Sequence, residues 1–180
     1  NETALVVWDE DAKIEHFIRS AEFDGSAGDF GFVLPVPTQP FAIEVADPNL
    51  FRTLAQSAPL SIGCSGSALP SKSGAQTLEE KSVGDYKVTV LRSADGAAMM
   101  TWLKSNGYKR RPAMEPWLDH YAKQNWVFVA FKYQGQLGPT PTKAVRVSFR
   151  TDRPHYPYKM PADTWELPHV REMNLFVLSQ

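Results

Sequence analysis

Cys64 carries the strongest potential nucleophile of this chain and is the only cysteine among its 180 residues. Its neighbours in Ile62-Gly63-Cys64-Ser65-Gly66 are small enough to leave a thiolate accessible, but a catalytic thiolate needs an adjacent imidazole to lower its pKa. A single cysteine also excludes an internal disulfide and a cysteine-based metal cluster. We interpret Cys64 as a free or intermolecularly paired thiol, and a hydrolase or thiol enzyme that pairs Cys64 with His155 is the alternative.

The four histidines lie on unrelated segments of the sequence, at positions 16, 120, 155 and 169. None of them has the spacing of a His-x-x-x-His or His-Glu-x-x-His metal motif, so we expect no metal site and no cofactor. His16 shares a strand face with Ile14 and Ile18, which is typical of a hydrogen-bonded core histidine. His155 stands in a basic and aromatic stretch, residues 153–159, that we interpret as a packed extended linker.

Three further patterns could suggest a ligand, and each has a simpler interpretation. The acidic run 9–11 lacks the spaced oxygen ligands, glycine and distal glutamate of a calcium loop, and it predicts a solvated turn. The basic run 109–111 follows a predicted helix end, where it complements the helix dipole. Gly25, Gly28 and Gly31 are too loosely spaced to bind a nucleotide.

Composition describes a globular chain, with 43% hydrophobic residues and a formal net charge of −1. A chain of this size buries a real core, and we expect one domain over residues 1–180. The near-zero charge makes nucleic acid a poor candidate partner. No apolar stretch reaches the roughly 20 residues that a membrane-spanning helix needs. Because the sequence starts at Asn1, an excised signal peptide is one explanation and a trimmed chain is another.

The elements that must position these residues begin with strands. Alternating apolar residues predict a hairpin of strands over 3–8 and 13–23, which leads into a third antiparallel strand over 30–36. Pro35, Pro37 and Pro40 then remove backbone donors, so this third strand cannot have a central place in a sheet.

Later segments predict helices and strands in alternation. A short helix follows Asp47-Pro48, and two paired helices lie near residues 99–105 and 116–121, the first of them ending at Asn106-Gly107. Residues 57–82 are rich in Ser, Gly, Ala and Lys and predict a long exposed loop or mobile lobe. Apolar residues in strand-like patterns predict four more strands, over 83–90, 126–133, 144–151 and 173–178. The last of these is almost wholly apolar, so we expect it to be central or well covered. The whole pattern predicts an α+β fold: a mostly antiparallel sheet with about three short helices packed on it and a long Ser/Gly-rich loop.

In these elements and their order, the chain resembles the bacterial domain of unknown function 2330 family. The match rests on Ala4-Leu5-Val6-Val7-Trp8-Asp9 with Glu15-His16-Phe17-Ile18-Arg19, on residues 29–40, on Val83-Gly84-Asp85-Tyr86 with Val90-Leu91, on residues 102–108, and on Asn174-Leu175-Phe176-Val177-Leu178. The resemblance implies an exported protein with a signal peptide, in some members with a further membrane segment, and it implies no activity. Family members often carry more cysteines than the single Cys64 found here.

Aromatic and proline residues outside the expected core form the candidate partner-binding surface. They are Pro35, Pro37, Pro40, Tyr156, Tyr158 and Trp165, together with Trp8. Exposed aromatic clusters are typical of protein interfaces. We therefore expect a non-enzymatic, periplasmic or otherwise extracytoplasmic protein that acts by protein contact, as an accessory or structural subunit of a membrane-associated complex. A module that binds a small ligand or an envelope polymer is the alternative, and it predicts one deep apolar cleft.

Overall fold

Two β-sheets and three helices form the part of the chain that the computed structural model describes, which is residues 2–21, 31–57, 75–135, 143–157, 159, 161–163 and 173–179. The strands are β1 (Glu2–Asp9), β2 (Ile14–Ala21), β3 (Gly31–Val36), β4 (Ala42–Val45), β5 (Gln76–Val83), β6 (Tyr86–Arg92), β7 (Val127–Tyr133), β8 (Val145–Arg150) and β9 (Met173–Ser179). The helices are α1 (Leu50–Ser57), α2 (Gly96–Ser105) and α3 (Met114–Ala122). The predicted α+β class is confirmed.

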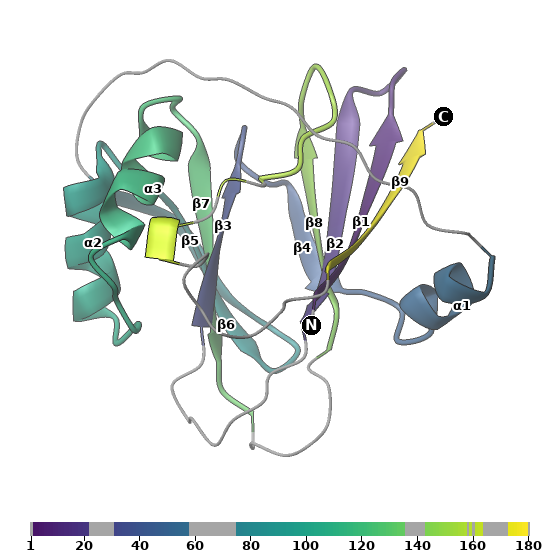
Figure 1. The fold of residues 1–180 in the computed structure, drawn as a ribbon, viewed down its shortest axis with the longest axis horizontal. Helices are drawn as coiled ribbons and strands as arrows, with labels where there is room; N and C mark the ends of the chain where they lie inside the picture. Colours follow the sequence, from purple (N-terminus) through teal and green to yellow (C-terminus); the bar gives the residue numbers. More distant parts are fainter. Residues whose placement is uncertain are drawn as a thin grey trace.

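The strands are divided between a five-stranded sheet, in the order β4-β8-β2-β1-β9, and a four-stranded sheet, in the order β3-β7-β6-β5. All pairs are antiparallel except β1 with β9. Figure 1 shows the resulting layers: α2 and α3, the four-stranded sheet, the five-stranded sheet, and α1 on the opposite side.

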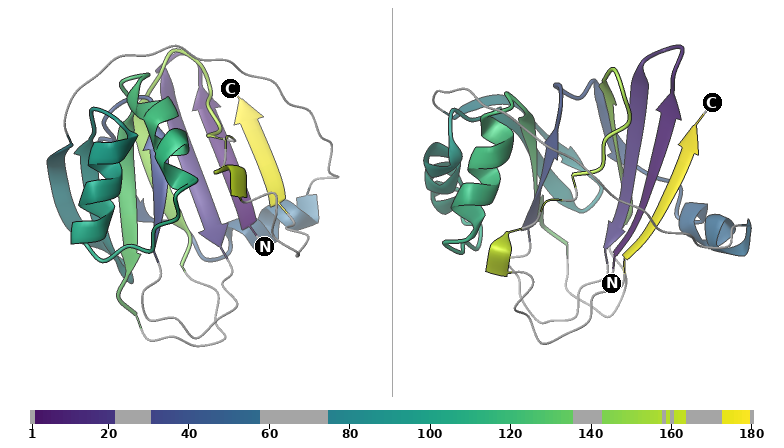
Figure 2. Two further views of the ribbon diagram at one scale, coloured as in Figure 1. Left: turned by 60° about the vertical axis from the view of Figure 1, so that its left-hand side comes forward. Right: turned by 45° about the horizontal axis from the view of Figure 1, so that its top comes forward.

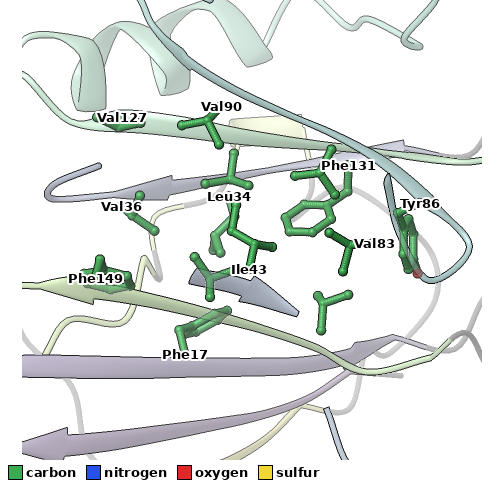
Figure 3. Close-up of a cluster of buried hydrophobic side chains, with 14 of the residues drawn as sticks. Phe17, Leu34, Val36, Ile43, Val83, Tyr86, Val90, Val127, Phe131 and Phe149 are labelled. Carbon is green, nitrogen blue, oxygen red and sulfur yellow. The ribbon is translucent and has the colours of Figure 1, made fainter. Parts of the chain in front are cut away.

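Apolar side chains from both sheets meet between them and form the main core, part of which Figure 3 shows. Val6 and Phe17 come from the five-stranded sheet, and Val90 and Phe131 come from the four-stranded sheet. A second cluster joins the outer face of the four-stranded sheet to α2 and α3, and a third joins the outer face of the five-stranded sheet to α1. Because the other sheet covers one face of β7 and the helical pair covers the other, β7 is apolar along most of its length.

The predicted helical pair is confirmed, with its ends close to the expected positions. Asp95 begins α2, since its Oδ1 accepts a hydrogen bond from the Ala98 N–H at 2.8 Å. Gly107 follows the helix with a φ of 70°, the left-handed conformation that glycine adopts at low cost. The Tyr108 N–H then donates to the Leu103 carbonyl at 2.9 Å, which closes the last turn.

Three expectations about the strands were wrong. The third strand, β3, does not extend the first hairpin but pairs with β7 in the other sheet, and residues 37–41 carry the chain from there to β4. Residues 76–82, expected within a long loop, form most of β5, a polar strand at a sheet edge. The last strand, β9, is an edge strand and not a central one. The rest of the expected loop, residues 58–74, lies outside the described residues.

Candidate functional site

The two sheets end in four edge strands: β4 and β9 in one sheet, β3 and β5 in the other. An edge strand presents unpaired backbone N–H and C=O groups, which form a template for another strand. Proteins that must stay unpaired usually protect such edges with proline, charged side chains, bulges or short length. The protection of each edge therefore indicates which of them is suited to a partner.

Three of the four edges carry such protection. Pro35 lies within β3 and has no N–H to offer, as the sequence predicted for an edge strand. The β4 strand has only four residues and carries Glu44, which forms an ion pair with Arg146 of β8 at 2.8 Å. The β5 strand carries the ion pair of Glu79 and Lys81 and has an irregular register beside Glu79.

The fourth edge, β9, has none of these features. Its sequence, MNLFVLS, contains no charged residue and no proline. Large apolar side chains on it are open to solvent: Met173 is 39% exposed, Val177 57% and Leu178 47%. Since neighbouring residues of a strand point to opposite faces, Val177 and Leu178 leave both faces of this edge apolar. Figure 2 shows β9 beside β1 at the limit of its sheet.

The inner part of β9 is anchored in the protein, so the strand is held in place. Leu175 packs against the core between the sheets, and Phe176 packs against the cluster that joins the sheet to α1. At the start of the strand, the Tyr156 hydroxyl donates to Met173 Sδ at 2.9 Å. The β9 edge thus combines fixed inner contacts with exposed apolar side chains.

Tyr156 belongs to an extended segment, residues 151–157, that we call the strap. It leaves β8 and lies over the inner face of the five-stranded sheet. The Thr151 N–H donates to the Lys13 carbonyl at 3.0 Å, and the Tyr156 ring packs on Phe17 with centroids 5.9 Å apart. Farther along, the Lys159 carbonyl accepts a hydrogen bond from Trp117 Nε1 of α3. The chain after β8 therefore contacts the five-stranded sheet through the strap and the helical pair through Lys159.

Beneath the strap lies Glu15, a fully buried carboxyl group that the sequence analysis did not single out. Its Oε2 accepts the His155 backbone N–H at 2.7 Å, and its Oε1 is buried without a hydrogen-bond partner among the described residues. Trp8 and Phe149 are its neighbours in register on the two adjoining strands. Burial raises the pKa of Glu15 to about 8, although the His155 N–H opposes the shift. The carboxyl group is therefore protonated at neutral pH.

The histidines within the described residues do not converge on one site. His16 Nδ1 is 2.7 Å from Ser148 Oγ, which confirms the predicted hydrogen-bonded histidine. The His155 ring packs edge-on against Trp126, and His120 Nδ1 is 3.2 Å from Lys159 Nζ. Burial is the main cause that lowers the pKa of each of these three histidines. Within the described ranges, no group of three or more His, Cys, Asp or Glu side chains is arranged to hold a metal ion.

Comparison with known proteins gives a family and no activity. The family model of DUF2330, described as an uncharacterized protein conserved in bacteria, matches residues 1–180. The chain belongs to this family. The resemblance found in the sequence is thereby confirmed. No curated protein and no solved structure matches the chain. In this DUF2330 protein, no helix among the described residues is long and apolar enough to span a membrane.

The predicted partner-binding residues of this DUF2330 protein do not form one surface. Pro35 and Pro40 are buried, so their assignment to an exposed surface was wrong. Pro37 is half-buried. Tyr156 is also half-buried, and it alone of the set is shown to contact β9. Tyr158 and Trp165 lie outside the described residues, as do Cys64 and His169.

Trp8, which was also expected at this surface, is buried. Sequence reasoning missed the β9 edge and Glu15, although both left a signal. The almost wholly apolar run of 173–178 was interpreted as a sign of burial, but the absence of any charge in it also fits an edge strand that pairs with a partner strand. Glu15 is two residues before Phe17, and residues two apart in a strand share a face. Since Phe17 is in the core, Glu15 falls on the core face of β2.

Proposed function

We propose that this protein is a non-enzymatic, exported protein that binds another protein by accepting a strand at the β9 edge. In this role it serves as an extrinsic accessory or structural subunit of a membrane-associated complex. The observation that carries the proposal is the contrast between edges: β9 alone among the four described sheet edges lacks proline, charge, bulge and short length. The compartment is supported by the exported character that the family resemblance implies.

The chemistry of β9 specifies the partner segment. Strand addition supplies affinity through backbone hydrogen bonds, and side chains that alternate between the faces supply specificity. Val177 and Leu178 offer apolar contacts on opposite faces, and β9 has no charge with which a charged partner strand could pair. Burying an unpaired charge at such an edge is costly. The occupant that fits best is an extended, uncharged, apolar segment of a different envelope protein.

The chain provides a matched pair of positions for testing this proposal. Val177 on β9 and Val45 on β4 are both exposed valines on edge strands of the same sheet, at 57% and 42% exposure. A photo-crosslinking amino acid is placed at either position in the natural bacterial host, and the crosslinked peptides are mapped by mass spectrometry. We expect Val177, and not Val45, to crosslink to one extended apolar segment of another envelope protein.

That segment, as a synthetic peptide, then gives a quantitative test with purified protein. Val177→Lys should weaken its binding at least tenfold, which is about 1.4 kcal/mol, whereas Val45→Lys should leave the affinity unchanged. Crosslinks from Val177 to a second copy of this chain would contradict the choice of partner. Equal crosslinking from both positions, or equal loss of affinity in both variants, would contradict the role of β9.

A further inference from the structure

Glu15 is placed where its ionised form has poor support. The side chain is fully buried, one oxygen has a single backbone N–H as partner, and the other has no partner among the described residues. An ionised carboxylate in such surroundings loses its hydration without compensation from a cation. When Glu15 loses its proton, the protein therefore gains by any rearrangement that admits water to this carboxylate.

The elements around Glu15 differ in how easily they can move. Its own strand, β2, is paired on both sides, with β1 and with β8. The strap, by contrast, has no strand pairing along residues 151–157. Its contacts include hydrogen bonds at Thr151, from the His155 N–H to Glu15 itself and from the Tyr156 hydroxyl to Met173, and the packing of Tyr156 on Phe17 and of His155 on Trp126. Local opening favours segments outside the hydrogen-bonded strands of a sheet, so the strap should yield before β2 does.

We propose that Glu15 is a proton-dependent latch, which holds the strap closed over the inner face of the five-stranded sheet while it is protonated and releases the strap when it ionises. Release withdraws Tyr156 from Phe17 and from Met173 at the start of β9. The protonation state of one buried carboxyl group therefore controls the cover of the core beside the β9 edge. This inference rests on the contacts of the strap and does not require the proposed function.

Among the groups that face one another under the strap, Glu15 is the one that changes its protonation state above neutral pH. The adjoining strands face it with Trp8 and Phe149, which do not titrate. The strap faces it with His155, whose pKa is lowered by burial and by the nearby Arg153, so this imidazole is already neutral at pH 7. Burial raises the pKa of Glu15 to about 8, which places the release in mildly alkaline solution.

The ring contact between Phe17 and Tyr156 provides a direct measurement of the closed strap. In protein with labelled Phe and Tyr, a nuclear Overhauser effect between these rings should be strong at pH 6.5 and should fall more than twofold at pH 9. The contact between Phe32 and Phe131, with ring centroids 4.6 Å apart in the core, serves as the internal control and should persist. In Glu15→Gln the Phe17–Tyr156 signal should be the same at both pH values.

The controls separate the latch from other causes. If the signal falls equally in wild type and Glu15→Gln, ionisation elsewhere opens the strap and the inference is wrong. If the wild-type signal does not fall, or falls together with the Phe32–Phe131 signal, no local release occurs and the inference is also wrong. Glu15→Met removes the same ionisable group and takes the place of Glu15→Gln if that variant does not fold.

Discussion

Replacing Glu15 by glutamine should change how the stability of the fold depends on pH. The folded protein raises the pKa of Glu15 from 4.5 to about 8, because the carboxyl group is buried. Between these two values the folded protein retains a proton that the unfolded chain has released. The free energy of unfolding must therefore fall as the pH rises through this range. A glutamine at this position resembles the protonated acid in shape and never ionises.

The size of the effect follows from linkage. A single proton held only by the folded state changes the free energy of unfolding by about 1.4 kcal/mol for each pH unit. From pH 5 to pH 7, both within the window from about 4.5 to about 8, wild type should lose about 2–3 kcal/mol relative to Glu15→Gln. The variant should therefore have similar stability at pH 5 and be clearly more stable at pH 7.

Urea unfolding at pH 5, 6 and 7, followed by circular dichroism, measures the difference directly. The difference between the two proteins removes contributions from other groups that titrate alike in both. Glu44→Gln provides the matched control, because Glu44 is exposed and forms a surface ion pair with Arg146. That change should shift stability by less than about 1 kcal/mol at every pH. Parallel curves for wild type and Glu15→Gln would refute the account of the buried carboxyl group.

Two further predictions concern the helical pair. Gly96→Ala places a Cβ against the Glu115 carbonyl oxygen, so α2 and α3 must separate, and urea unfolding should show a loss of about 1–3 kcal/mol. The exposed neighbour Ala97→Ser should lose less than half of that. Asp95→Ala removes the acceptor for the Ala98 N–H at the start of α2, and thermal unfolding should report a loss of about 1 kcal/mol. A thermal midpoint equal to that of wild type would contradict the capping role of Asp95.

Local patterns predicted the elements better than their arrangement. The helical pair and its glycine end depend on residues close in sequence, such as Asn106 and Gly107, and these predictions were confirmed. Pro35 correctly placed β3 at an edge, because a missing N–H restricts a strand wherever it lies. The division into two sheets could not be predicted in this way, since the pairing of β3 with β7 joins residues about a hundred positions apart.

The candidate site was harder to predict for a related reason. An apolar strand such as β9 has the same composition whether a neighbour within the chain or a partner covers it, and only the sheet order shows that it is an edge. Pro40 and Trp8 were expected at a surface because composition does not show which of these residues the fold covers, and both are buried. The strap contributes to the burial of Glu15, and the residue that donates to its carboxyl group, His155, is 140 positions farther along the sequence.

The central claim, that β9 accepts a strand from a partner protein, is tested most directly by hydrogen exchange at its backbone amides. In the free protein, the β9 amides that point toward β1 should be protected, and those that point outward should exchange freely, in alternation along 173–179. When the segment crosslinked at Val177 is bound, the outward amides should become protected as well, while those of β4 should not change. Protection that stays the same along β9 in the presence of that segment would contradict strand addition.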